Sequence, residues 1–201
     1  MTLARLAVLA ASSAVLACAT PSGTPIPVTN PTPGETKPRD FQATGEIFFD
    51  AQGSGTSVAF SDFRIVGPRA NMTRDSNGNW GGNLGDRNMI VTVQPGRITG
   101  DGVDLYVVRK NLTVSVQGMY FQRQVWFTMK PGEIQGTTDG GRCSFDLTPT
   151  KVPNNPPGTY MGGVGCGGSL RQGTLQLTGT AANIENPPMP QLIFALLLVL
   201  P

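Results

Sequence analysis

The stretch Met89–Gly100 reads MIVTVQPGRITG, and Val125–Gly136 repeats its plan as VWFTMKPGEIQG, 36 residues further along the chain. In both copies a β-rich run leads into Pro-Gly. Pro followed by Gly is a preferred centre for a four-residue turn, because Pro fixes φ at the first central position and Gly accepts the positive φ of the second. An Ile and another Gly follow each turn. Each copy therefore predicts a strand, a tight turn and a second strand, with a bulge or a close backbone approach at the last Gly.

The repeat extends upstream of these stretches. Gly82 matches Gly118 and Arg87 matches Arg123 at the same offset, so that the full units are 82–100 and 118–136. Two copies are too few for a propeller or a solenoid. We interpret the repeat as two copies of one hairpin, with a structural and not a chemical role.

The neighbouring segments alternate apolar and polar residues with a period of two, which is typical of half-buried strands. This pattern covers Val103–Val108 and Leu112–Gln117, with Arg109–Asn111 as a short connection between them. Further strands are predicted at Glu46–Asp50, Ser57–Ile65, Arg142–Leu147 and Thr174–Gly179. No segment shows a clear apolar stripe of period 3.6. The sequence predicts an all-β domain, a mostly antiparallel β-sandwich or small β-barrel built from meander hairpins.

The composition excludes several classes of function. The 201 residues include 26 Gly and 17 Pro, which suits a turn-rich β fold, and no His. The absence of His excludes Ser-His-Asp and Cys-His relays and His-ligated metal sites. A net charge of +2 is too small to favour nucleic acid as a partner. We predict no cofactor; chemistry with paired carboxylates or oxygen ligands remains open.

The N-terminus has the layout of a secretory signal peptide over residues 1–17. Arg5 precedes an apolar run, Leu6–Ala17, that is shorter than the roughly 20 residues of a membrane-spanning helix. Val15-Leu16-Ala17-Cys18 resembles the lipobox of bacterial lipoproteins. The resemblance implies that Cys18 becomes the first residue of the mature chain and carries a lipid. Ordinary cleavage after Ala19, which would give a secreted chain, is the alternative.

Residues 18–40 are rich in Pro and contain no apolar period, so they predict an extended tether behind the lipidated Cys18. The single folded domain is then 41–201. This organisation places the protein in the bacterial cell envelope, at the outer membrane or its periplasmic face, with the membrane as a partner through the lipid. With Cys18 assigned to lipid, Cys143 and Cys166 remain as a pair. We predict a disulfide that closes a loop of about 23 residues and stabilises the fold by roughly 3 kcal/mol.

The C-terminal segment Leu192–Leu200 is an unbroken apolar run. As a strand it would be apolar on both faces, which fits a strand buried between two layers. We predict a buried terminal strand that closes the core. A surface that docks on lipid or on a partner is the alternative.

Three sets of residues are weak candidates for a site. The first set loosely resembles a Ca²⁺-binding loop and consists of Asp75, Asn77, Asn79 and Asp86. The plainer interpretation of this segment is a hairpin turn at Asn77-Gly78. The second set is an aromatic platform that could bind a sugar or a peptide and consists of Tyr106 and Trp126. The alternative is that both rings pack in the core or across strands. The third set could supply a glycosidase-like pair of carboxylates and consists of Asp101, Asp104, Asp139 and Asp146. The alternative is that these are isolated acidic residues exposed to solvent.

The sequence predicts an exported, lipid-anchored envelope protein with a non-catalytic structural or binding role, whose partner is an envelope protein or a glycan. One alternative is a lipid-anchored inhibitor of a hydrolase, with Pro149–Gly168 as its protruding loop. Another is a carbohydrate-active enzyme with paired carboxylates.

Overall fold

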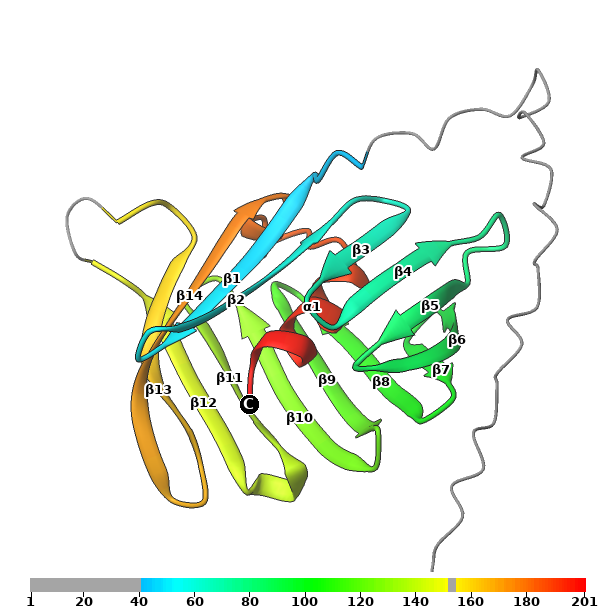
Figure 1. The fold of residues 1–201 in the computed structure, drawn as a ribbon. Coiled ribbons are helices and arrows are strands. Elements are labelled where there is room, and N and C mark those ends of the chain that lie inside the picture. The colour runs from blue at the N-terminus through cyan, green and yellow to red at the C-terminus, as the bar shows by residue number, and fades with distance from the viewer. Residues whose placement is uncertain (1–40, 152–154) are drawn as a thin grey trace, which may run out of the picture. The chain divides into compact units, whose positions relative to one another are not determined.

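The computed structural model describes residues 41–151 and 155–201, and these form a closed barrel of antiparallel strands (Figure 1). Each strand pairs with the next one in the chain, and the last pairs with the first. The prediction of a mostly antiparallel meander is confirmed. Of the two predicted architectures, sandwich and barrel, the barrel is correct. The signal peptide, Cys18 and the tether lie outside the described residues.

Most of the fourteen strands follow one another through tight turns. The strands are β1 Gly45–Ala51, β2 Ser54–Phe60, β3 Arg64–Gly67, β4 Ala70–Arg74, β5 Trp80–Leu84, β6 Arg87–Gln94, β7 Arg97–Gly100, β8 Val103–Lys110, β9 Thr113–Tyr120, β10 Arg123–Lys130, β11 Glu133–Thr138, β12 Cys143–Pro149, β13 Thr159–Cys166 and β14 Ser169–Gly179. The connection between β12 and β13, residues 150–158, is longer.

The core of the domain is the lumen of the barrel. Along β10, Val125, Phe127 and Met129 are buried, whereas the alternating Gln124 and Trp126 are exposed. The other long strands alternate in the same way, which is what a sheet with one dry face requires.

A helix, α1 Gln191–Val199, lies in this lumen (Figure 1). All of its residues except Leu198 are buried. The prediction that this run is buried is correct, whereas the prediction of a strand is wrong, and so is the alternative of an exposed docking surface. An eight-stranded barrel is just filled by its own side chains, so a barrel of fourteen strands needs further filling. A helix that is apolar on all sides supplies it.

The turns of the internal repeat form as predicted. Gln94 pairs with Arg97, and Lys130 pairs with Glu133, across the two Pro-Gly turns. The predicted close backbone approach is also confirmed. A Cβ added at Gly100 would lie 2.3 Å from a carbonyl oxygen of β6, and one at Gly136 would lie 2.4 Å from a carbonyl oxygen of β10.

The upstream glycines of the repeat have the same role. Gly82 and Gly118 have φ of +134° and +146°, and a Cβ at Gly118 would lie 2.0 Å from the carbonyl oxygen of Asp104. Glycines at such positions let a strand bend sharply, and such bends allow a sheet to curve until it closes. The repeat is therefore architectural in these positions.

Local details depart from the predicted strand limits. The run Ser57–Ile65 is divided between β2 and β3, and the connection predicted at Arg109–Asn111 is a turn at Asn111–Leu112. Part of Pro149–Gly168, predicted as a protruding loop, is strand β13, and residues 150–158 lie between β12 and β13. The abundance of Gly in β13 hid the alternation that marks a strand.

The predicted disulfide between Cys143 and Cys166 is present. The two residues are direct partners across β12 and β13. They lie at the barrel end that holds the turns β1–β2, β3–β4, β5–β6, β9–β10 and β13–β14, which we call the mouth. The chain enters β1 and leads into α1 at the opposite end, and α1 ends at the mouth.

Candidate functional site

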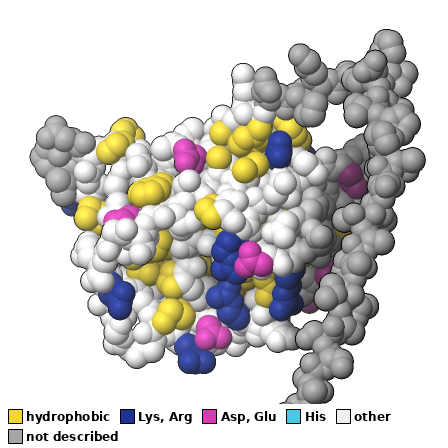
Figure 2. All heavy atoms as spheres, viewed as in Figure 1, with side chains coloured by type: hydrophobic (Ala, Val, Ile, Leu, Met, Phe, Trp, Pro, Cys, Tyr) yellow, Lys and Arg dark blue, Asp and Glu magenta, His cyan; other side chains and the backbone are white. Residues whose placement is uncertain are grey.

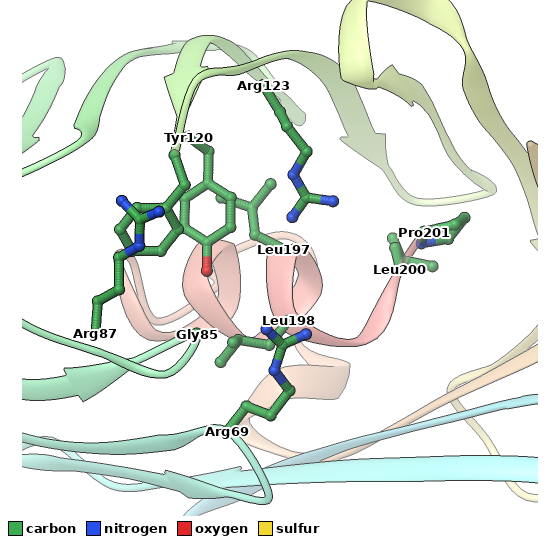
Figure 3. Close-up of a pocket in the computed structure, with 10 residues that line it drawn as sticks. Arg69, Gly85, Arg87, Tyr120, Arg123, Leu197, Leu198, Leu200 and Pro201 are labelled. Atoms are coloured by element: carbon green, nitrogen blue, oxygen red, sulfur yellow. The ribbon is translucent and has the colours of Figure 1, made fainter. Parts of the chain in front are cut away.

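A cavity of about 410 Å³ opens at the mouth beside the end of α1 (Figure 3). Its walls combine guanidinium groups with apolar side chains. We call it the arginine pocket, and its lining consists of Arg69, Gly85, Arg87, Tyr120, Phe121, Arg123, Leu197, Leu198, Leu200 and Pro201.

The internal repeat builds much of the pocket. Arg87 is the first residue of β6 and Arg123 the first residue of β10, at matching places in the two copies. Each follows a two-residue turn at the mouth, so that each copy contributes one arginine to the rim. The sequence showed that these arginines match but gave no reason to assign them to a site.

The pocket carries an excess of positive charge. Arg69 forms an ion pair with Asp86, with 2.7 Å between its Nη2 and the carboxylate Oδ2. Arg87 and Arg123 have no carboxylate partner within the described ranges, and each lies over an aromatic ring. The guanidinium carbon of Arg87 is 5.1 Å from the ring centroid of Phe121, and that of Arg123 is 5.8 Å from the ring centroid of Tyr120. Lys and Arg side chains also gather on the face seen in Figure 2, with acidic groups beside some of them.

Tyr120 brings a buried hydroxyl to this positively charged pocket. The residue is 2% exposed, and its Oη has no hydrogen-bond partner among the described residues. Burial raises the pKa of Tyr120 to about 12, and nearby Arg123 and Arg69 oppose the rise. At neutral pH the group is therefore a protonated donor. A buried hydroxyl without a partner costs about 1–3 kcal/mol, so its orientation into the pocket (Figure 3) calls for a ligand that accepts a hydrogen bond.

The turn that follows Tyr120 has an unfavourable backbone. Phe121 and Gln122 have φ of 47° and 65°, whereas the matching turn of the first copy has Gly85 and Asp86 at 61° and 69°. A left-handed conformation in a bulky residue costs on the order of 1–3 kcal/mol. The strained turn therefore belongs to the second copy of the repeat, in which the turn residue Phe121 lines the pocket.

The surrounding turns hold Phe121 in that conformation. Its backbone N–H donates to the carbonyl of Gly102 at 2.6 Å. A Cβ added at Gly85 would come within 3.1 Å of the Phe121 ring, and one at Gly102 within 2.9 Å. The ring therefore occupies space that only glycines in the neighbouring turns leave free, and from there it supports the guanidinium of Arg87.

The arginines also face the end of α1. A helix C-terminus carries partial negative charge, and a nearby cation gains about 0.3–1 kcal/mol from it. Across the described parts of the chain, however, no hydrogen bond joins Arg69, Arg87 or Arg123 to a carbonyl of the helix. Arg69 donates to Asp86, whereas, among the residues described, the N–H groups of Arg87 and Arg123 remain available. A guanidinium presents these groups in a fork that matches carboxylate and phosphate oxygens.

The residues of the predicted calcium loop do not converge. Asp75 lies in the turn between β4 and β5, and Asp86 lies in the next turn, at the other end of β5. The Asp75 carboxylate accepts hydrogen bonds from the backbone N–H groups of Asn77 and Asn79, both at 2.9 Å. Gly78 has φ of 88°, so the hairpin-turn interpretation is correct. Within the described residues, no group of three acidic or thiol side chains is placed to hold a metal.

The aromatic platform is on the outer surface. Tyr106 and Trp126 are 46% and 43% exposed, and the register places both opposite Gln117 of β9, which lies between their strands. Of the alternative, core or cross-strand packing, the core part is therefore wrong for both rings, whereas Tyr106 packs across strands against Arg97, its direct partner on β7. The guanidinium of Arg97 covers Tyr106, with its carbon 5.0 Å from the ring centroid.

The candidate catalytic carboxylates belong to separate elements. Asp104 on β8 forms an ion pair with Arg97 at 2.9 Å, and this hydrogen bond lowers the pKa of the carboxyl. Asp139 lies in the turn after β11, and Asp146 faces outward on β12. Asp101 lies in the turn between β7 and β8. None of these carboxylates lines the arginine pocket.

Comparison with known proteins returned no family model, no curated protein and no solved structure that matches this chain. Within the described residues, no helix has the length and apolarity needed to cross a bilayer.

Proposed function

We propose that this chain is a binding protein of the bacterial cell envelope that takes an anionic ligand in the arginine pocket. The observation that carries the proposal is the buried, unpartnered hydroxyl of Tyr120 beside two guanidinium groups that lack a carboxylate partner in the described structure. A carboxylate or phosphate would accept from the hydroxyl and neutralise the arginines together.

The location in the envelope is supported by the N-terminal sequence. The lipobox-like Val15–Cys18 would attach the chain to a membrane, and the Pro-rich segment behind it would hold the barrel away from the surface. The disulfide suits an oxidising compartment.

Binding accounts for the pocket better than catalysis does. The described lining offers hydrogen-bond donors, cations and apolar surface, and none of its side chains is a carboxylate, thiol or imidazole that could act as a base or a nucleophile. We do not propose the inhibitor alternative, because part of the loop on which it depends is strand β13.

The test is calorimetric titration of the full chain with inorganic phosphate and with acetate. We expect saturable binding that Arg87→Gln and Arg123→Gln each weaken about tenfold or more, the effect of losing a charged hydrogen bond. Arg142→Gln is the matched control, because Arg142 is an exposed arginine at the same barrel end and outside the pocket lining. Absence of binding, or equal affinity in all of these proteins, would overturn the proposal.

A further inference from the structure

We infer that the ligand is an anionic amphiphile, with a carboxylate or phosphate head group in the arginine pocket and an alkyl chain in a second cavity next to it. This inference rests on the proposed function. The second cavity has a volume of about 320 Å³ and also opens at the mouth. We call it the apolar pocket, and its lining consists of Phe49, Ala51, Val164, Gly165, Cys166, Ser169, Arg171, Val199 and Pro201.

The two pockets share a wall. Pro201 lines both, and the end of α1 contributes Leu200 to the arginine pocket and Val199 to the apolar pocket. The segment from Val199 to Pro201 therefore separates them, and a chain that leaves the first pocket across Pro201 reaches the second. No other part of the described lining is common to both pockets.

The arginine pocket is lined mainly by polar groups and also has a smaller apolar area. Beside the guanidinium groups it presents Leu197, Leu198 and Leu200. An alkyl chain attached to an anionic head group would extend over this small apolar area toward Pro201. Covering apolar surface stabilises a complex by about 25 cal/mol per Å².

The apolar pocket has the walls that an alkyl chain requires. The side chains of Phe49, Val164 and Val199 are at most 6% exposed and form its base. The disulfide of Cys166 fixes β12 to β13 at its edge. Arg171 is the charged residue of its described lining, at an exposed position where its stem can pack on a chain while its head stays in water.

The energetics give a direct signature. Each methylene group that becomes buried contributes a factor of about four in affinity. A carboxylate series from butanoate through hexanoate to octanoate, and the matching alkyl phosphates, should therefore bind more tightly with each added carbon until the chain fills the apolar pocket. Acetate and inorganic phosphate provide the head groups without a chain.

The experiment titrates the full-length protein with these two series by calorimetry, at concentrations below micelle formation. We expect a rise of about fourfold per methylene in at least one series, and the series with the higher affinity identifies the head group. Ser169→Trp should remove this chain-length dependence, because it fills the apolar pocket, while binding of the free head group remains. Leu170→Trp is the matched control, since the Leu170 side chain is 68% exposed and outside the pocket lining.

The outcomes separate the two proposals. If acetate or phosphate binds in an arginine-dependent manner but affinity does not increase with chain length, the proposed function stands and the amphiphile inference is wrong. A chain-length dependence that survives Ser169→Trp would also overturn it, because the chain would then lie elsewhere. If neither head groups nor amphiphiles bind, the proposed function itself fails.

Discussion

Replacement of Tyr120 by Phe removes a hydroxyl that lies buried without a partner in the described structure. The aromatic ring remains, so the packing of a side chain that is 2% exposed and the contact of Arg123 with the ring are retained. Only the cost of keeping a polar group dry is relieved. We therefore expect Tyr120→Phe to stabilise the unliganded protein, in contrast to most core substitutions.

The expected gain is about 1–3 kcal/mol in the free energy of unfolding, the cost of an unsatisfied buried polar group. For a domain of this size each kcal/mol corresponds to roughly 2–4 °C in Tm. The measurement is equilibrium unfolding in urea, with the slope of the transition checked for equality between the two proteins. Tyr106→Phe is the control, since Tyr106 is 46% exposed and its loss of a hydroxyl should change stability by less than about 0.5 kcal/mol.

Ligand should reverse the order of stability. With saturating phosphate the wild-type hydroxyl gains an acceptor, so the advantage of Tyr120→Phe should shrink or disappear. A Tyr120→Phe protein that is less stable than wild type without ligand would refute the reasoning. It would mean that the hydroxyl is already satisfied in the free protein, and the main support for the anion site would be lost.

Four further predictions test other features of the structure. Replacing Cys143 and Cys166 together by Ser should lower the free energy of unfolding by roughly 3 kcal/mol, as measured in urea. The pKa of Tyr120 is raised to about 12 against an ordinary value near 10, so the unfolded chain loses this proton first. The Tyr120 contribution to stability should therefore fall between pH 10 and pH 12, by on the order of 2–3 kcal/mol. Tyr120→Phe should remove this part of the loss and keep the part from Tyr160, whose pKa burial also raises. Gln122→Gly should raise the urea midpoint, with a gain of about 1 kcal/mol, because the relief of a positive φ exceeds the entropy cost of glycine. Gly118→Ala should prevent folding or lower Tm strongly, as circular dichroism would show, because its Cβ would collide with a carbonyl oxygen of the neighbouring strand.

The strands and hairpins were predictable because their signals are local. Alternation along Val103–Val108 and the Pro-Gly turns specify extended chain and its reversals within a few residues. The state of Leu192–Leu200 was not predictable in this way. A run with no polar residue has no period, and the choice between helix and strand depends on the width of the lumen that receives it.

The arginine pocket could not be predicted from the sequence for a related reason. The repeat paired Arg87 with Arg123, but nothing in it placed Arg69 or Tyr120 beside them, because the four meet only when the barrel closes. Phe121-Gln122 also contradicts the local rules for tight turns, which favour Gly, Asn or Asp at such φ values. A conflict of this kind between sequence and backbone is expected at functional positions.

The seam between β1 and β14 has a consequence for how the protein folds. Glu46 pairs with Thr178, so the last pairing of the barrel joins residues that lie far apart in the chain. A closed sheet of paired strands gives the helix that follows β14 no lateral entry, so the helix enters the lumen before this seam forms or through an open end of the barrel. Until then the apolar inner faces of all strands are open to water. Such long-range pairing makes folding slow, on the scale of milliseconds to seconds, and exposes the chain to aggregation during that time. A barrel of this design would need a chaperone, or a low local concentration, during the interval before closure.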